Sequence, residues 1–217
     1  MTNTVTHYEA DYHGTRHKSH FNEDYYTARA KVALSKFFSN IPKDAKILDY
    51  GCGLGQNIYL LPNAKGYDIS TFGLDFCRAK GLDVTDDIEK IENDSFDYVF
   101  SSHVLEHHPH PKQMIEEMRS KLKKNHDLIL VIPFEKHGKS SFDLDLNQHL
   151  HMWNFRTINN LLITNGFKIK SNQYLRGAGY EKLLPLFRIN FNAYRFATNA
   201  VSRLFGIKEI MVVATKV

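Results

Sequence analysis

The feature that most constrains this chain is the segment at residues 47–55, where an apolar run ends in an acidic residue and a Gly-x-Gly-x-Gly turn follows at once. Such a run is typical of a buried parallel strand, and glycines let the next turn bring backbone close to a ligand. Asp68 ends the next apolar stretch at about the distance, roughly 20 residues, at which nucleotide-binding βαβ units place a ribose-binding carboxylate. The spacing therefore predicts a site for an adenosine-containing cofactor.

The glycine pattern helps to choose between cofactors. A nicotinamide dinucleotide site has a G-x-G-x-x-G pattern, in which backbone amides and a helix N-terminus face the pyrophosphate. Here Gln56 occupies the position of the third glycine, and the glycines at 51, 53 and 55 directly follow Asp49. The pattern therefore departs from that of a nicotinamide dinucleotide site, with a simple tight turn as the alternative.

Strand-like segments recur at regular intervals along the chain. They are residues 46–50, 64–68, 81–85, 96–102, 127–132, 167–172 and 209–216. Helical patterns separate most of them and fall at residues 24–40, 57–61 (short), 111–122 and 157–165. This alternation predicts an α/β fold, a mostly parallel sheet with helices on both faces.

The length of 217 residues suits a single domain with a substantial core. We expect one domain over residues 1–217, with a helical, His-rich N-terminal extension at 1–43 and a helical insertion at 174–207 before the last strand. The insertion is rich in aromatic and arginine residues. It is interpreted as a helical hairpin that packs on the sheet edge, an acceptor lid, a dimer surface or a membrane-surface helix.

Composition narrows the location and the partners. No apolar run reaches the roughly 18 residues of a membrane span, and the polar N-terminus lacks the apolar core of a secretory signal. The two cysteines, Cys52 and Cys77, do not suggest a disulfide framework, so we expect a cytoplasmic protein. The net charge is +4 without a dense Lys/Arg run, which makes nucleic acid an improbable partner.

Five ordered elements resemble those of class I S-adenosylmethionine-dependent methyltransferases. Asp49 with the glycine turn is similar to motif I of that family. The other four similar segments are 66–70 (second strand), Asp87-Ile88 before 94–99 (adenine acid and fourth strand), 101–107 ("S-x-x-h-L-E-H") and 128–133 (fifth strand). The resemblance implies a Rossmann-like seven-stranded sheet whose last strand is antiparallel, and S-adenosyl-L-methionine as the cofactor.

The resemblance also implies roles for single residues. Asp49 would help to position the ammonium of the cofactor, and Asp68 would accept hydrogen bonds from both ribose hydroxyls. The short segment after Asp68 leaves open which of Asp83, Asp86 or Asp87 reaches the adenine. The expected cofactor-binding residues are Asp49, Gly51, Cys52, Gly53, Asp68, Ile69, Asp87, Ile88, Ser101 and His103.

Histidines gather near the expected acceptor side. His103, Glu106 and His107 have a spacing that places them on one face of a helix or tight turn. They follow the fourth strand, and ligands bind at the carboxyl ends of strands in open α/β sheets. His149 and His151 lie in the long connection after the fifth strand.

Three interpretations of these histidines stay open. They shape the pocket without moving protons, or His107 or His151 is a general base, or His103, Glu106, His107 and His151 bind a divalent metal. The metal hypothesis rests on a resemblance to the E-x-x-E-H stretch of small-RNA 2′-O-methyltransferases and some quinone O-methyltransferases, in which His103 stands where that pattern has Glu. We predict His107, His151 and Glu106 as catalytic residues and assign no metal.

The resemblance implies an enzyme that transfers a methyl group. We expect O-methylation of a small molecule or a sugar, in glycan or secondary-metabolite biosynthesis. The alternatives are an RNA-directed 2′-O-methyltransferase with a metal site, and a catalytically silent cofactor-binding regulatory protein.

Overall fold

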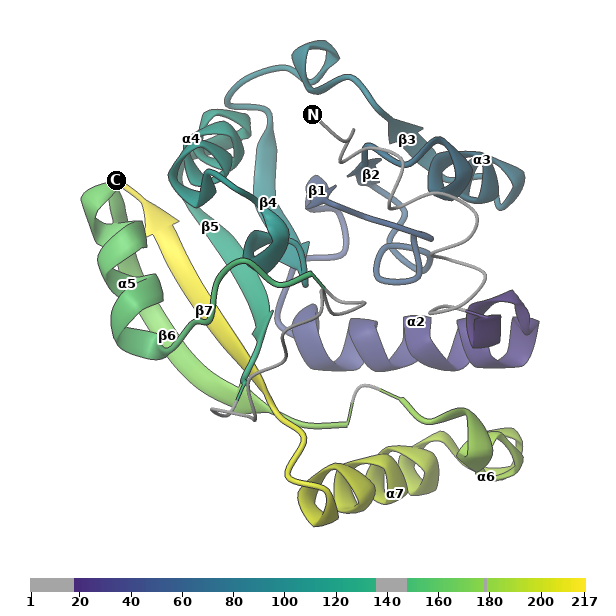
Figure 1. Cartoon of the computed structure of the whole chain (residues 1–217). Coiled ribbons are helices and arrows are strands. Elements are labelled where there is room, and N and C mark those ends of the chain that lie inside the picture. Colours follow the sequence, from purple (N-terminus) through teal and green to yellow (C-terminus); the bar gives the residue numbers. More distant parts are fainter. Residues whose placement is uncertain (1–17, 136–147, 178) are drawn as a thin grey trace.

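The computed structural model describes residues 18–135, 148–177 and 179–217, and its centre is a seven-stranded sheet of order β3-β2-β1-β4-β5-β7-β6 (Figure 1). The strands are β1 (Ile47–Tyr50), β2 (Ala64–Tyr67), β3 (Asp83–Thr85), β4 (Phe96–Ser102), β5 (Leu122–Pro133), β6 (Phe167–Leu175) and β7 (Glu209–Lys216). Strand β7 pairs antiparallel with both neighbours, and the other pairs are parallel. The predicted Rossmann-like sheet with an antiparallel last strand is confirmed.

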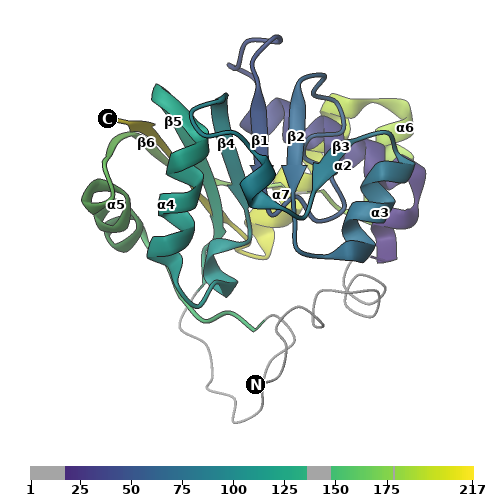
Figure 2. The same ribbon diagram turned by 90° about the horizontal axis from the view of Figure 1, so that it is seen from above.

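Helices lie on both faces of the sheet (Figure 2). They are α2 (Glu23–Phe37), α3 (Thr71–Ala79), α4 (Pro111–Lys121), α5 (Phe155–Thr164), α6 (Leu184–Ile189) and α7 (Phe191–Leu204), with 3₁₀ turns η2 (Lys18–Phe21), η3 (Ile88–Lys90), η4 (Leu105–His107) and η5 (Glu181–Leu183). Along β5, Leu128 and Leu130 belong to the core under α4 and α5, whereas Ile129 and Val131 belong to the core under α2. This period of two is why the strand is apolar throughout.

One predicted helix is absent. The expected short helix at residues 57–61 forms turns between the glycine segment and β2. Too few residues lie between Gly55 and Pro62 to nucleate a stable helix. The helix start nearest the glycine turn is instead that of α3, since a Cβ on Gly73 would come within 2.9 Å of the Gly53 carbonyl oxygen.

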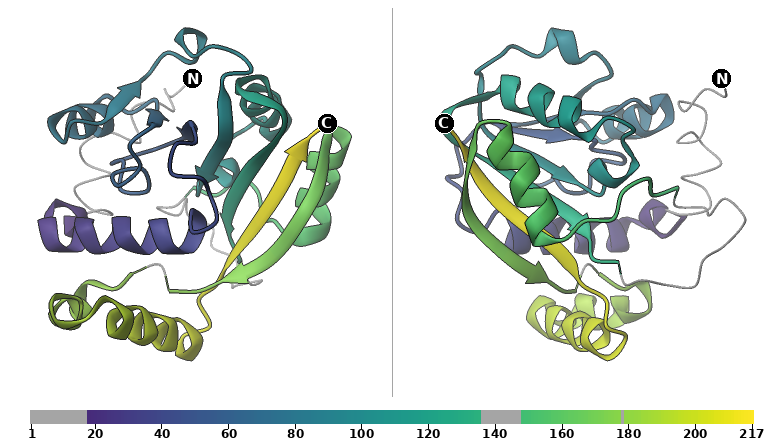
Figure 3. Two further views of the ribbon diagram at one scale, coloured as in Figure 1. Left: turned by 180° about the vertical axis from the view of Figure 1, so that it is seen from behind. Right: turned by 60° about the vertical axis from the view of Figure 1, so that its left-hand side comes forward.

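The insertion before β7 forms η5, α6 and α7, and it packs on α2 rather than on the sheet edge (Figure 3). Leu184 and Tyr194 are buried with Tyr25 and Val32 of α2. Both ends of the insertion meet at one place, because Leu175 of β6 and Glu209 of β7 are paired. The insertion therefore leaves and rejoins the sheet at the carboxyl edge of the parallel strands.

Candidate functional site

The glycine turn after β1 has a backbone that a side chain would not tolerate. Gly51 and Gly53 have φ of +80° and +53°, in the left-handed region that favours glycine. A Cβ on Gly51 would lie 2.3 Å from a methyl carbon of Val104, whereas one on Gly53 would meet no atom within 4 Å among the described residues. Gly51 is thus needed for packing, and Gly53 leaves open space beside the backbone for a ligand.

Asp68, at the end of β2, is held in place by the turn. Its Oδ2 accepts a hydrogen bond from the Gly53 amide at 2.7 Å, and its Oδ1 accepts one from the Ser70 amide at 2.9 Å. The neighbouring Ile69 is 46% exposed. A fixed carboxylate beside an exposed apolar side chain can bind a ribose and one face of a purine.

Asp49, within β1, is a fully buried carboxyl group. Neither of its oxygens has a hydrogen-bond partner among the residues that the structure describes. Burial, with a smaller contribution from Asp68, raises the pKa of Asp49 well above its usual range. An unpaired buried acid is costly, so Asp49 fits a cationic or hydrogen-bond-donating ligand group, such as the cofactor ammonium.

Two of the predicted cofactor residues direct their side chains away from the turn. The buried Cys52 thiol interacts with Cys77, and a Cβ on Gly66 would lie 2.7 Å from the Cys52 sulfur. The hydroxyl of Ser101 donates to the Tyr50 carbonyl oxygen at 2.8 Å and joins β4 to β1. These side chains shape the site from within, and only their backbone is left to face a ligand.

Asp87 and Ile88 lie after β3. The Asp87 carboxylate caps η3 by accepting from the Glu89 amide at 3.0 Å, and it lies 3.4 Å from the Lys90 ammonium. Ile88 is half-buried and packs against the main core, as does Tyr67. Both Asp87 and Asp83 therefore have local partners, since Asp83 pairs with Lys65.

His103, directly after β4, has φ of +58° and joins two acids. Its Nε2 is 3.0 Å from Glu209 and its Nδ1 is 3.4 Å from Glu106. Partial burial opposes the charged imidazolium, but the two carboxylates outweigh it and raise the pKa of His103 to about 9. Glu209 also pairs with Lys36 of α2 at 2.5 Å. His103 is therefore cationic at neutral pH.

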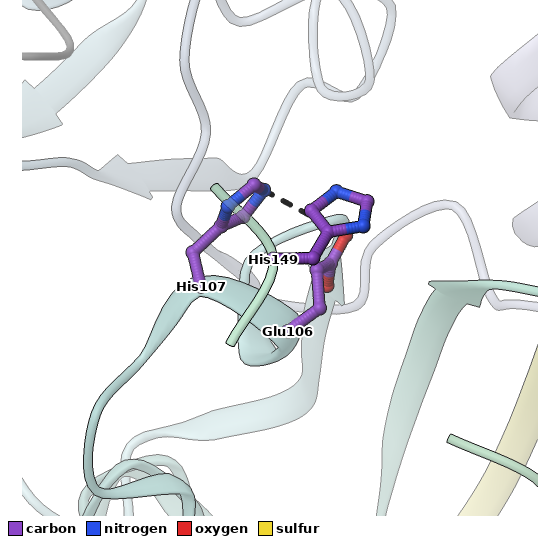
Figure 4. A group of neighbouring side chains, drawn as sticks. All are labelled: Glu106, His107 and His149. Carbon is purple, nitrogen blue, oxygen red and sulfur yellow. Dashed lines mark ion pairs between the residues drawn. The ribbon is translucent and has the colours of Figure 1, made fainter. Parts of the chain in front are cut away.

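Glu106, His107 and His149 form a cluster beyond the carboxyl end of β4 (Figure 4). Their candidate ligand atoms lie within 4.8 Å of one another. Glu106 is fully buried, and its carboxylate lies 3.8 Å from His107 Nε2. Two backbone bonds fix this arrangement, because the Leu150 and His151 amides both donate to the Glu106 carbonyl oxygen.

His149 and His151 make different contacts. His149 packs edge-on against His107 with ring centres 4.7 Å apart, and its Nδ1 contacts the Glu135 carboxylate. His151 instead directs Nε2 to the His108 carbonyl oxygen at 3.0 Å, and its ring packs at a tilt against that of Trp153. The structure thus brings Glu106 and His107 together with His149, whereas the predicted catalytic residue His151 lies to one side.

His107 has the protonation state that a base requires. Burial lowers the pKa of His107 below its ordinary value, although the Glu106 carboxylate opposes the shift. The imidazole is therefore neutral at pH 7 and able to accept a proton.

Sequence reasoning missed four residues of the site: Lys36, Val104, Glu135 and Glu209. Glu135 and Glu209 contact histidines that are distant in sequence, and nothing in the local pattern indicates those pairs. The predicted metal set also contained His151 in place of His149. Side chains alternate between two sides along an extended segment, so His149 and His151 would both lie on the same side. The sequence therefore offered no reason to choose one over the other.

Comparisons place this geometry among known proteins. Residues 20–172 match the family described as a methyltransferase domain. No curated protein sequence matches the chain. Among the described residues, no helix is both long and apolar enough to cross a membrane.

Solved structures share the fold at low identity. A SAM-dependent methyltransferase from Archaeoglobus fulgidus is 19% identical with a TM-score of 0.60, over 92% of this chain and 99% of that one. A putative methyltransferase from Haloferax volcanii, in complex with the Trm112 activator, is 17% identical with a TM-score of 0.65, over 92% and 93%. A putative methyltransferase from Bacillus halodurans is 16% identical with a TM-score of 0.60, over 86% and 98%.

Proposed function

The chain belongs to the S-adenosylmethionine-dependent methyltransferases, and from this membership we propose that it methylates an oxygen atom of a small-molecule or sugar acceptor. When bound, the cofactor supplies an electrophilic methyl group on a sulfonium. The protein then has to bind and orient both partners, exclude water and accept the proton of the acceptor hydroxyl.

In this proposal the cofactor lies along the carboxyl ends of β1, β2 and β4. Asp49 accepts the ammonium of the amino-acid end, and Asp68 accepts the ribose hydroxyls. Ile69 and Ile88 flank the adenine, and the open space at Gly53 lets the cofactor approach the backbone. The buried, unpartnered carboxylate of Asp49 is the observation that best supports this placement.

The observation that carries O-methylation is the position of His107. A neutral imidazole beside the fully buried Glu106 can take a proton, and the carboxylate then stabilises the resulting imidazolium. N-methylation of a neutral amine has less need of such a base, because its lone pair attacks without prior loss of a proton. We assign His107 as the general base, Glu106 as its partner, and His149 as a wall that orients the ring.

A small acceptor is favoured over RNA by the charge of the chain. The net charge of +4 is spread without a dense Lys/Arg run, whereas RNA binding depends on a concentrated basic surface. We therefore propose a hydroxylated small molecule or a sugar.

Two experiments test the proposal. Isothermal titration calorimetry should show binding of S-adenosylmethionine and of its demethylated product, and a screen of hydroxylated acceptors with radiolabelled cofactor should find a methylated one. Absence of cofactor binding would refute the whole proposal. Cofactor binding with turnover only on amines would refute O-methylation, and binding without turnover on any acceptor would favour the silent regulatory alternative.

A metal-dependent mechanism is the second candidate, and it has its own observation. Glu106, His107 and His149 converge to within 4.8 Å, and nitrogen and carboxylate ligands suit a divalent transition metal. In that case activity is lost in EDTA and restored by one divalent ion, and His149→Ala lowers the metal content of the purified protein. A rate that EDTA leaves unchanged supports the base.

A further inference from the structure

The α6–α7 hairpin carries the most exposed large apolar side chains of the described residues. Among the large apolar side chains of the described residues, the four with the highest exposed fractions are Ile189 (82%), Leu204 (81%), Phe196 (78%) and Phe205 (69%). All four lie between the end of α6 and the turn after α7. Single exposed apolar residues are ordinary on a surface, but a cluster of them marks an interaction site.

Helix α7 buries hydroxyl-bearing side chains against the protein and exposes large apolar side chains on its opposite side. The buried side of the helix carries Tyr194, Thr198 and Ser202, whose spacing of four places them on one face. Ser202 accepts a hydrogen bond from the Gly177 amide there. The outward side carries Phe196 and Leu204. Packing within this molecule therefore does not account for the apolar outer face.

The elements around α7 leave that face open. In Figures 1 and 3 the hairpin is the outermost element beside α2, and no other described element lies on its far side. The hairpin joins β6 and β7 at Leu175 and Glu209, which are paired at the carboxyl edge. A partner on this face would lie at the same end of the sheet as the proposed acceptor site.

The charge of the hairpin indicates the chemistry of that partner. Between Glu181 and Glu209 the sequence has no acidic residue and five basic ones, which are Lys182, Arg188, Arg195, Arg203 and Lys208. Of these, Arg188 pairs with Asp24 of α2 and Lys208 lies over two aromatic rings, whereas Lys182 and Arg203 are exposed. Arg203 is exposed one position before Leu204. A second copy of the chain would place the same positive charge against itself, which disfavours a dimer through this face.

We propose that the α6–α7 hairpin docks on the surface of an anionic phospholipid bilayer. Phe196, Leu204 and Phe205 enter the boundary between headgroups and acyl chains, and the exposed Arg203 meets the anionic headgroups. Basic charge combined with exposed Phe and Leu side chains on a helix is the composition of a helix that lies in the membrane interface. The hairpin lies on the membrane and does not cross it.

Vesicle co-sedimentation of the full chain tests the proposal without any acceptor, so its result is independent of the proposed reaction. The protein should bind vesicles of phosphatidylglycerol and phosphatidylcholine at least about tenfold more tightly than vesicles of phosphatidylcholine alone. Raising the NaCl concentration from about 0.1 M to about 0.5 M should weaken the binding, because salt screens the headgroup charge.

A matched pair of double variants locates the surface. Phe196→Glu with Leu204→Glu should lower anionic-vesicle binding by about tenfold or more. Ile163→Glu with Val217→Glu changes the net charge equally at two exposed apolar positions elsewhere, and it should retain most of the binding. Both variants should bind S-adenosylmethionine as the wild type does, which shows that they fold. If the first variant does not fold, Phe196→Ser with Leu204→Ser replaces it.

Three results would overturn the proposal. The first is equal binding to anionic and neutral vesicles, or no binding to either. This result would exclude the anionic bilayer and favour an acidic protein as the partner. The second is equal loss in the two double variants. The third is a dimer, seen by sedimentation velocity, that the Phe196→Glu and Leu204→Glu changes convert to a monomer.

Discussion

At Asp68 one carboxylate serves the protein and, in our proposal, the cofactor. Its two oxygens already accept from the Gly53 and Ser70 amides, so the ribose hydroxyls meet an acceptor that is fixed in advance. Asp68→Ala should weaken S-adenosylmethionine binding by about 10- to 100-fold, or about 1–3 kcal/mol. Calorimetry measures this, with Asp75→Ala on the exposed side of α3 as the control. Unchanged affinity in Asp68→Ala would remove the residue from the cofactor site.

His107 is the residue on which the proposed chemistry depends. His107→Ala should lower kcat by about 10²–10⁴-fold, whereas His126→Ala, at a partly exposed position outside the site, should leave it unchanged. Cofactor affinity should not change in either variant. Wild-type turnover in His107→Ala would show that the cluster is structural and that positioning alone carries the reaction.

The pKa of His107 also predicts a pH profile. A base must be deprotonated, so the rate falls as the pH drops through the pKa of the imidazole. Because burial lowers the pKa of His107 below its ordinary value of about 6.5, the rate should be level at neutral pH and fall only on the acidic side of that value. A fall that begins above pH 7 would contradict the assignment.

At the scale of elements, α5 depends on its first turn. Asn154 accepts from the Thr157 amide, and the Thr157 hydroxyl accepts from the Asn154 amide, which completes a capping box. Asn154→Ala should lower the free energy of unfolding by about 1 kcal/mol. Asn160→Ala, on the exposed side of the same helix, is the matched control, and it should be neutral or slightly stabilising. Urea unfolding curves compare the two, and equal curves would mean that the cap contributes nothing.

Across the whole molecule, one ion network joins three distant segments. Lys36 of α2, His103 after β4 and Glu209 of β7 are linked through the Glu209 carboxylate. Burial opposes ionisation of Glu209, but His103 and Lys36 outweigh it and lower the pKa of that carboxyl group. The network therefore ties α2 and β7 to the centre of the sheet.

The stability that this network contributes depends on pH, and the two pKa shifts give the direction of that dependence. The pKa of His103 is raised to about 9, so its contribution is fully present below about pH 6.5 and is lost as the pH rises through 9. The pKa of Glu209 is lowered, so its contribution is present above about pH 4.5 and is lost in acid. The two together stabilise the fold most between about pH 4.5 and 6.5.

His103→Asn tests the alkaline side of that window, since Asn tolerates the left-handed backbone at this position. Urea unfolding at pH 6.0 and 9.5 should show that the variant is less stable at the lower pH and that the difference narrows at the higher one. The change should be about 1 kcal/mol, because the His103 side chain is 41% exposed and solvent screens its charge. A difference that stays constant with pH would contradict the network.

The sequence by itself determined the sheet and the glycine turn that follows β1. Six of the seven strands both begin and end within three residues of their predicted bounds, and β4 and β7 have those bounds; β5 begins five residues earlier than predicted. Strand periodicity and the glycine turn are local signals, because each depends on neighbouring residues of one segment. The prediction of a short helix at 57–61 was wrong because it also used a local pattern alone, and that pattern does not show that the connection is too short for a helix.

Only the tertiary structure decided the rest of the site. It chose His149 over His151 as the neighbour of His107, paired His103 with Glu209, and placed the insertion on α2 with an apolar face outward. These outcomes depend on contacts between residues far apart in the chain. Periodicity assigns each segment its own buried face but carries no information about which distant side chain lies against it, because that depends on how the elements pack together in space.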